Sequence, residues 1–393
     1  MQSGMFALAT LLILQGLSIS ARATLVVPSR EFPTIQDALD AAPARAVIRI
    51  LAGVYDLTEP LWIRDKRLLN IIGAGSEGAG RTELVGPLPT RRDAVADPEL
   101  ARGVFNIVDS SVEINDVLLR GFDAGIVGWQ TDATGRADPR NRFKKMAIRD
   151  TGRGILWKSR GKLDVSDSTI SGVSGNGISL APAFAPGRIG TLLKFNLSSL
   201  IISDFGNAGI VYVDDPGVCD DEHSVKNATL IGGGGPAILA IRSGVCVFDS
   251  HIAIPRVAGV VALSAAVLVE RTKIFFPAPT IDNRWGAGII ASAFGTGRSL
   301  VTLHDNEIKN VEHSYITNLG SDVVFIGNEL VCREKFDLAA GSHLGFGFTF
   351  NDGGSPAQCS DECPAQLGLP PLSFRQCQAE PFSDSPPSFP NPI

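Results

Sequence analysis

The chain has 393 residues, of which 44% are hydrophobic and 7% aromatic, and its formal net charge is −6. This is enough apolar material for a large core, whereas the acidic balance and the lack of a long Lys/Arg-rich stretch argue against nucleic acid as a partner. The 42 glycines and the few aromatic residues favour many turns and small, stackable side chains over a few large helices.

The N-terminal residues predict a secretory signal. Residues 5–19 form an apolar run, and Ala21-Arg22-Ala23 is a small-x-small cleavage site, so residues 1–23 are predicted to be removed and the mature chain to start at Thr24. No Lys or Arg precedes Phe6, which leaves an uncleaved anchor as the alternative. No later run approaches the ~20 apolar residues of a membrane span, so we expect a secreted protein with no membrane contact after cleavage.

The next segment predicts a helical cap. Residues 32–43 contain Thr34 and Asp37 in a Thr-x-x-Asp capping box, which predicts a short helix. Apolar runs at 46–55, 61–63 and 68–72 then predict the first strands. A helix at this place would cover the open end of a stack of strands, which otherwise invites aggregation.

One hydrophobic pattern recurs along most of the remaining chain. An apolar anchor has an apolar residue five positions before it, another three positions after it, and a Gly-Ile-like pair beyond, as around Ile170. Four of the eight intervals between anchors are 22 residues, and the others exceed 22 by 6 to 12. Stacked coils produce intervals that exceed the length of one turn but never fall below it, because a surface loop can lengthen whereas the core pattern cannot lose residues. The anchors are Leu119, Ile148, Ile170, Ile202, Leu230, Ile252, Ile274, Ile308 and Leu330.

Each repeat has the features of strands joined by tight turns. Its apolar residues alternate with a period of two and are interrupted by polar pairs such as Asp249-Ser250 and Asp305-Asn306, which suit turns. In six coils a glycine precedes the Ile-like position, as expected where a bend needs a positive φ or leaves no room for a Cβ. We therefore predict an all-β solenoid over residues 24–337. The six glycines are Gly125, Gly154, Gly177, Gly209, Gly259 and Gly288.

The same register predicts which side chains of the Gly-Ile strands point outward. They are mostly apolar, and in the coils from Val127 onward Lys158 is the one ionisable residue among them. A parallel sheet that is hydrophobic on both faces is normally covered on both. We expect long loops or the Phe-rich residues 344–350 to cover it. The outward positions are Val127, Trp129, Leu156, Lys158, Ser179, Ala181, Val211, Val213, Leu239, Ile241, Val261, Leu263, Ile290 and Ser292.

Three of the longer intervals grow at the same place, just after the Gly-Ile strand. Stacking would put these insertions on one edge of the solenoid, where such proteins bind partners. Arg140, Arg142 and Lys144, together with Lys158 one coil on, could pair with carboxylate or sulfate groups. Ordinary surface charge is the alternative.

The third insertion is acidic. Asp214, Asp215, Asp220 and Asp221 lie close together in the sequence and could offer oxygen ligands to Ca²⁺, although their spacing is not that of an EF-hand. A solvated acidic turn is the alternative, and no cofactor is required by any other feature.

The six cysteines fit an oxidising compartment and allow 15 pairings. Cys219 and Cys246 precede strand positions in adjacent coils, so we expect them to pair and to clip the acidic loop to the next coil. The other four would hold together a C-terminal cap within residues 338–393, whose last twenty or so residues resemble a disordered Pro/Ser-rich tail. A zinc cluster is disfavoured, because the spacing matches no common zinc motif. These four are Cys332, Cys359, Cys363 and Cys377.

The N-terminal motifs are similar to the opening of pectinesterase-like members of the pectin-lyase-like superfamily, and the Gly-Ile repeats resemble the right-handed β-helix repeat family. The resemblance rests on residues 34–43, Ile48 to Tyr55 and Ile71 to Gly75, and it covers about residues 30–337 with the repeats. It implies a single-stranded right-handed parallel β-helix and a carbohydrate partner, in a superfamily that holds both enzymes and adhesins. The catalytic patterns of pectinesterases, polygalacturonases and calcium-dependent pectate lyases are not visible, so no catalytic residue is carried over.

Three functional hypotheses follow. The first is a secreted, monomeric β-helix protein that binds or is associated with an acidic extracellular or cell-wall polysaccharide without catalysing a reaction. The second is a lyase or epimerase of uronic-acid polymers, with Lys158, Arg140, Arg142 and Asp214 as catalytic candidates. The third is an adhesion or protein-interaction scaffold.

Overall fold

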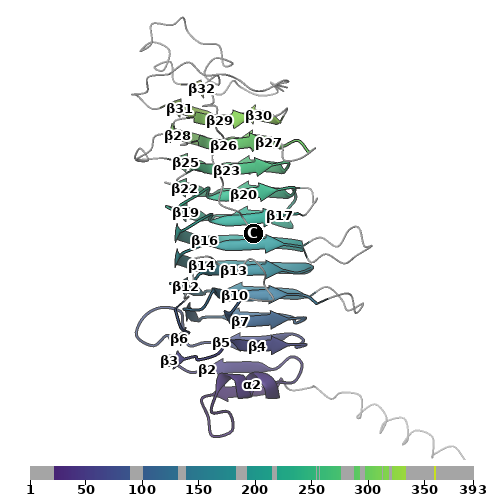
Figure 1. Ribbon diagram of the computed structural model, residues 1–393, viewed down its shortest axis with the longest axis vertical. Coiled ribbons are helices and arrows are strands. Elements are labelled where there is room, and N and C mark those ends of the chain that lie inside the picture. Colours follow the sequence, from purple (N-terminus) through teal and green to yellow (C-terminus); the bar gives the residue numbers. More distant parts are fainter. Residues whose placement is uncertain are drawn as a thin grey trace, which may run out of the picture.

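The computed structural model describes residues 22–88, 101–131, 139–182, 193–214, 219–253, 255, 257–275, 287–292, 297–311, 313–317, 321–332 and 358–359. These residues form a column of stacked coils with one helix, α2, near its N-terminal end (Figure 1). Every strand pair formed by them is parallel, and the fold is a right-handed parallel β-helix, as predicted.

One strand of each coil belongs to a 10-stranded sheet, which we call sheet I. Its strands contain the Gly-Ile positions. They are β4 (Leu61–Arg64), β7 (Gly103–Val108), β10 (Ala124–Trp129), β13 (Arg153–Lys158), β15 (Ile178–Ala181), β17 (Ile210–Val213), β20 (Ile238–Ile241), β23 (Ala258–Leu263), β26 (Ala287–Ser292) and β29 (His313–Thr317).

The other strands form a 22-stranded sheet, sheet II, which is bent into two arms. Two 13-residue strands, β14 (Gly161–Val173) and β16 (Leu193–Phe205), run through the bend and join the arms. Arm IIa contains β1 (Thr24–Val27), β2 (Val47–Ile50), β5 (Leu69–Ile72), β8 (Val112–Asn115), β11 (Arg140–Lys144), β18 (His223–Lys226), β21 (Gly244–Phe248), β24 (Ala266–Glu270), β27 (Leu300–His304) and β30 (Asp322–Ile326). Arm IIb contains β3 (Gly53–Asp56), β6 (Thr82–Val85), β9 (Leu118–Arg120), β12 (Ala147–Arg149), β19 (Thr229–Ile231), β22 (His251–Ala253), β25 (Lys273–Phe275), β28 (Glu307–Val311), β31 (Glu329–Cys332) and β32 (Gln358–Cys359).

The predicted anchors stack directly on one another in arm IIb. Leu119 pairs with Ile148 and Ile148 with Ile170, and the same register continues through all nine anchors to Leu330. The first eight are at most 1% exposed. The 22-residue pattern is therefore one full turn of the solenoid.

The Gly-Ile positions of sheet I stack in the same way, and their glycines lie too close to the next coil for a side chain. A Cβ on Gly154 would lie 2.2 Å from the carbonyl oxygen of Gly177, and a Cβ on Gly177 would lie 2.5 Å from that of Gly209. Neither residue has a positive φ. Of the two reasons anticipated for these glycines, close backbone approach is therefore the correct one for both.

The bend between the arms has a repeated backbone conformation. The residue three positions before each anchor has a φ between 48° and 63°, a left-handed conformation that Asp, Asn and Gly adopt most readily. Five of these nine residues are Asp or Asn and one is Gly. They are Asp116, Lys145, Asp167, Ser199, Asn227, Asp249, Arg271, Asp305 and Gly327.

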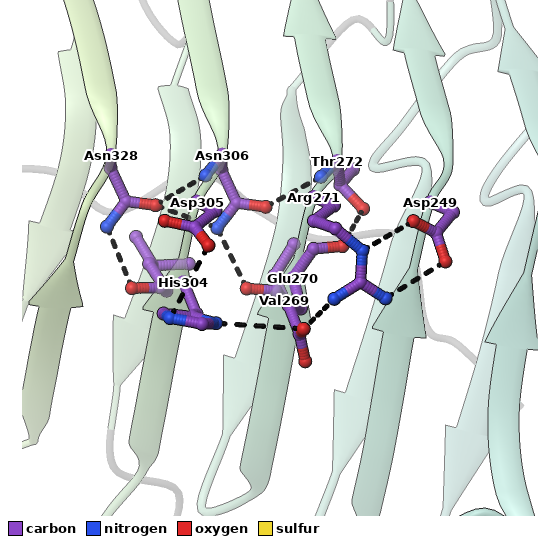
Figure 2. A network of polar contacts seen from close by, with 10 residues as sticks. Asp249, Val269, Glu270, Arg271, Thr272, His304, Asp305, Asn306 and Asn328 are labelled. Carbon is purple, nitrogen blue, oxygen red and sulfur yellow. Dashed lines mark hydrogen bonds and ion pairs between the residues drawn. The ribbon is translucent and has the colours of Figure 1, made fainter.

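A ladder of buried polar side chains follows at the next position of the bend (Figure 2). The backbone N–H of Thr272 donates to Oδ1 of Asn306 over 2.9 Å, and that of Asn306 donates to Oδ1 of Asn328 over 2.8 Å. Asn306 also donates through Nδ2 to the carbonyl oxygen of Val269 over 2.8 Å. The ladder satisfies backbone groups that the bend removes from the strand pairing.

The N-terminal cap is formed as predicted, with one addition. Helix α2 (Ile35–Ala41) begins at Thr34, which forms the capping box with Asp37. The helix packs against β1, β2 and β4 through buried Ile35, Ala38 and Leu39. Strand β1 precedes the helix and pairs with β2, so the stack begins one strand earlier than predicted.

The outward side chains of sheet I are mostly buried, in two clusters separate from the interior core. One includes Val127, Trp129 and Leu156, and the other extends from Val211 to Ile290. This agrees with a covered face. Residues 344–350, which the sequence nominates as cover, lie outside the described residues, as do residues 1–21 and most of 338–393. No helix among the described residues is long and apolar enough to span a membrane.

We expect Asn306→Ala to lower the free energy of unfolding by at least about 2 kcal/mol. It leaves the N–H of Thr272 and the carbonyl of Val269 buried without their partner, and each such group costs about 1–3 kcal/mol. Chemical denaturation measures the change. His304→Ala is the control, because its contacts at 3.5 and 3.7 Å are those of a surface side chain worth up to about 1 kcal/mol. Equal losses in both variants would contradict a structural role for the ladder.

Candidate functional site

The three predicted insertions leave the solenoid at one edge. They connect β10 to β11, β15 to β16 and β17 to β18, and each connection runs from sheet I to arm IIa. We call this the loop-bearing edge. The sequence predicted this common position correctly, because the strands before and after each insertion occupy the same places in successive coils.

A row of cations runs along the arm IIa side of this edge. Arg140 pairs in register with Lys162, and Lys162 with Lys194, on the consecutive strands β11, β14 and β16. Neighbouring strands lie about 4.8 Å apart, so three positive side chains with the same orientation follow one another at that spacing. Like charges placed side by side on adjacent strands destabilise a sheet unless anions compensate them.

The compensation in this row is incomplete. Asp164 lies 3.1 Å from Arg140, 3.6 Å from Lys162 and 4.0 Å from Arg142, so one carboxylate serves three cations. Glu113 adds a contact of 3.8 Å to Arg142. Arg140, Arg142 and Lys162 therefore share two carboxylates, which leaves one surplus positive charge among these three cations. Lys194, the third member of the row, forms an ion pair with Glu222.

Two further cations lie on the sheet I side of the edge. Lys158 ends β13 and is exposed, and its amine has no hydrogen bond or ion pair to any described residue. Arg160 follows two residues later and is buried, with no partner for its Nε among the described residues. Of the predicted candidates, Lys158 alone has an uncompensated charge, since Arg140 and Arg142 are paired as above and Lys144 lies 3.6 Å from Asp167.

Lys158 does not share a sheet with the other predicted cations. Arg140, Arg142 and Lys144 lie on β11 of arm IIa, whereas Lys158 lies on β13 of sheet I. The loop-bearing edge lies between Lys158 and the other three cations, so positively charged side chains occur on both sides of the edge. The sequence prediction missed Lys162 and Lys194, although their alternation with Leu163 and Phe195 would have placed them on the outer surface.

Sheet I has two further outward cations that the sequence prediction missed. Arg64 ends β4 in the same column as Lys158 and stacks on Trp62, with its Cζ 4.2 Å from the ring centroid. Arg153 begins β13, and burial lowers the pKa of its guanidinium, which the charge of Asp123 partly offsets. The outward positions of the described sheet I strands contain no Asp or Glu.

The acidic insertion is divided into separate ion pairs. Asp214 accepts from Nε of Arg242 over 2.6 Å, while Asp220 and Asp221 contact His223 and Lys226, each over 2.7 Å. Asp215 lies outside the described residues. Within the described ranges no three His, Cys, Asp or Glu side chains could hold a metal ion together, and Ca²⁺ binding by this loop stays a prediction.

The predicted disulfide between Cys219 and Cys246 is present, with the two Cα atoms 5.2 Å apart. Cys246 lies in β21, so the bond ties the acidic loop to the next coil. Cys363 and Cys377 lie outside the described residues, and the pairing of the last four cysteines stays a prediction.

A buried histidine that the sequence prediction missed lies beside this disulfide. His223 begins β18 in register with Phe195 and is 1% exposed, whereas His251 is exposed and His304 half-buried, both having been expected on the surface. Its ring is stacked with Tyr212, and its Nδ1 lies 2.7 Å from Oδ1 of Asp220. The signal was available, because Phe195 and His223 both lie two positions before an inward residue.

No protein-family model matches the sequence, and no curated protein matches it. Among solved structures, the chain is similar to the catalytic domain of a GH87 α-1,3-glucanase in complex with tetrasaccharides, with 12% identity, 86% of this chain and 68% of that chain covered, and a TM-score of 0.53. It is also similar to the A-module of a mannuronan C-5 epimerase from Azotobacter vinelandii, with 14% identity, 82% of this chain and 89% of that chain covered, and a TM-score of 0.49. At 12% identity, the similarity to the glucanase domain supports the β-helix fold and says nothing about activity.

Asp220→Asn tests the electrostatic contribution of the His223 contact. Burial raises the pKa of Asp220, but hydrogen bonds from His223 and from the N–H of Glu222 outweigh it, so the pKa lies below its ordinary value of 3.8. A lowered pKa stabilises the fold above about pH 4, and this stabilisation is lost as the pH falls through the folded-state value. We expect the variant to be less stable than the wild type at pH 7 and the gap to close as the pH is lowered to about 3.

Thermal unfolding between pH 3 and pH 7 measures the gap. Asp221→Asn is the matched control, because Asp221 is exposed and its ion-pair partner is the half-buried Lys226 rather than a buried histidine. A gap for Asp220→Asn that stays constant across this range would contradict the electrostatic origin.

Proposed function

We propose that this protein binds an anionic polysaccharide outside the cell, along its loop-bearing edge. The observation that supports this best is the in-register row of Arg140, Lys162 and Lys194, in which Arg140 and Lys162 share the single carboxylate of Asp164 while Lys194 pairs with Glu222. A linear polymer with an acid group on successive sugars presents a repeating charge, and a β-helix presents a repeating counter-charge at about 4.8 Å. Lys158 extends the positive surface across the edge.

A carbohydrate fits this surface better than a nucleic acid. The chain as a whole is acidic, with a net charge of −6, so its positive charge is local and does not form the extended basic footprint of nucleic-acid-binding proteins. The structural neighbour with the TM-score of 0.53 is itself complexed with tetrasaccharides, which supports the class of ligand but not its identity. The disulfide between Cys219 and Cys246 supports an oxidising, extracellular location.

Binding without catalysis is favoured over a lyase or epimerase. Proton abstraction from a uronate needs a base with a nearby cation or acid. Among the described outward positions of sheet I there is no carboxylate, and Arg140 and Arg142 are engaged in ion pairs. The proposed role is therefore attachment to an acidic polymer.

Binding to polygalacturonate, alginate, a sulfated glycan and a neutral α-glucan, measured by calorimetry at several salt concentrations, tests the proposal. We expect binding to one or more of the anionic polymers that weakens with salt, and none to the neutral one. Lys162→Ala with Lys194→Ala should weaken it roughly tenfold, which corresponds to about 1.4 kcal/mol. The double variant Lys273→Ala with Lys309→Ala removes the same charge from arm IIb, far from the edge, and should leave affinity unchanged.

Equal loss in both double variants, or binding to the neutral glucan alone, would contradict the proposal. A lyase is distinguished from a non-catalytic binding protein by incubation with the uronate polymers while ultraviolet absorbance is followed, because β-elimination creates a C=C bond that absorbs. Growth of that absorbance with the wild-type protein would show that a binding role is incomplete.

A further inference from the structure

The turn after β13 contains one residue more than the corresponding turn after β7. Val108 of β7 and Lys158 of β13 occupy the same column of sheet I, and Glu113 and Asp164 both pair with Arg142 in arm IIa. Five positions separate Val108 from Glu113, whereas six separate Lys158 from Asp164. The extra residue places Arg160 at the loop-bearing edge, just before Gly161, whose φ of +88° turns the chain into arm IIa.

Two hydrogen bonds connect this turn to Gln130, which follows β10 in the preceding coil. The backbone N–H of Gln130 donates to the carbonyl oxygen of Lys158 over 3.2 Å. The backbone N–H of Arg160 donates to Oε1 of Gln130, also over 3.2 Å. Because Oε1 of Gln130 accepts this bond, the Nε2 group of the same side chain points away from the N–H of Arg160. This Nε2 group donates to no described residue.

These three side chains offer donors and no free acceptor. Arg160 is 6% exposed, and its Nε is buried without a partner among the described residues. The amine of Lys158 and the amide of Gln130 likewise lack side-chain acceptors in the described part of the chain. A buried guanidinium without a counter-ion is costly, whereas a planar oxyanion satisfies its N–H groups with strong, charge-assisted hydrogen bonds.

We propose that Arg160, Gln130 and Lys158 form a binding site for one oxyanion group of the polymer, a uronate carboxylate or a sulfate ester. This inference rests on the proposed function and adds to it a specific position for one acid group. The site lies beside the row that begins at Arg140, because Arg160 stands two residues before Lys162 in that row. The row would supply general attraction, and the site would recognise one group by its geometry.

Calorimetry with monosaccharides tests the site apart from the polymer. The probes are sodium D-glucuronate, D-glucose 6-sulfate and D-glucose, at constant ionic strength. We expect one of the two anionic probes, or both, to bind the wild type, and D-glucose to give no heat. The stronger of the two anions identifies whether the site is made for a carboxylate or a sulfate.

Arg160→Met keeps the length of the side chain without its charge and should weaken anion binding at least tenfold. Lys158→Ala, at an exposed position that does not affect folding, should weaken it about three- to tenfold, which corresponds to about 0.7–1.4 kcal/mol. Lys273→Ala is the control, because it removes a cation from arm IIb, outside both the site and the row, and it should change monosaccharide affinity less than twofold. Melting temperatures confirm that all variants are folded.

The outcomes separate the two proposals. If the polymer binds in a salt-dependent way but neither anionic monosaccharide binds, or Arg160→Met and Lys158→Ala have no effect, the site is wrong and the proposed function stands. If the monosaccharides bind through Arg160 but no polymer binds, the proposed function is wrong and the site stands as a small-anion site. A lower melting temperature for Arg160→Met with unchanged anion affinity would show that the guanidinium is already paired within the chain, which overturns the site.

Discussion

The in-register stacking of parallel strands is the constraint on which the rest of this structure depends. When each coil lies about 4.8 Å from the next, every side chain lies directly against its equivalents above and below. Inside the solenoid this is favourable, because columns such as Ile126, Ile155 and Ile178 bury apolar surface continuously. At the bend it aligns polar side chains into the ladder of Thr272, Asn306 and Asn328.

On the outer surface the same constraint has an electrostatic cost. Arg140, Lys162 and Lys194 are neighbours because their strands are, and a one-residue shift of one strand would turn its inward residues out of the core. Asp164 relieves this repulsion for part of the row. In arm IIb the charges are matched: Lys273 lies 2.9 Å from Glu307 of the next strand, and Lys309 lies 2.7 Å from Glu307 and 3.0 Å from Glu329, so two cations face two carboxylates. The contrast is why the partly compensated row at the loop-bearing edge suggests an external anion.

The outer face of sheet I is buried, so the loop-bearing edge is the better candidate for a binding surface. Side chains such as Val211, Leu239 and Val261 form a second apolar cluster on that face and have no polar groups for binding a sugar. The exposed, uncompensated Lys158 stands where that face ends. The edge is also where successive coils accept insertions, since a connection between two strands can lengthen without disturbing either column of the core. Binding properties can therefore change there at little cost to the fold.

Much of this architecture was predictable from the sequence alone, because it repeats. The spacing of Leu119 through Leu330 determined the solenoid, its register and the identity of the inward residues, and the capping box at Thr34 and Asp37 determined the helix. The proximity of Cys219 and Cys246 followed from the same register. These inferences depended on local alternation and on a fixed period, both of which are written in the order of residues.

The tertiary structure decided which charges are already paired. Arg140 and Arg142 looked available in the sequence, but Asp164 and Glu113 come from neighbouring coils, so their contacts depend on side-chain reach across strands. The burial of Arg160 and of His223 was equally invisible, since each depends on how a turn directs one side chain. Periodicity determines which face a residue occupies, whereas its partners are determined by distances of a few ångströms that only the folded chain sets.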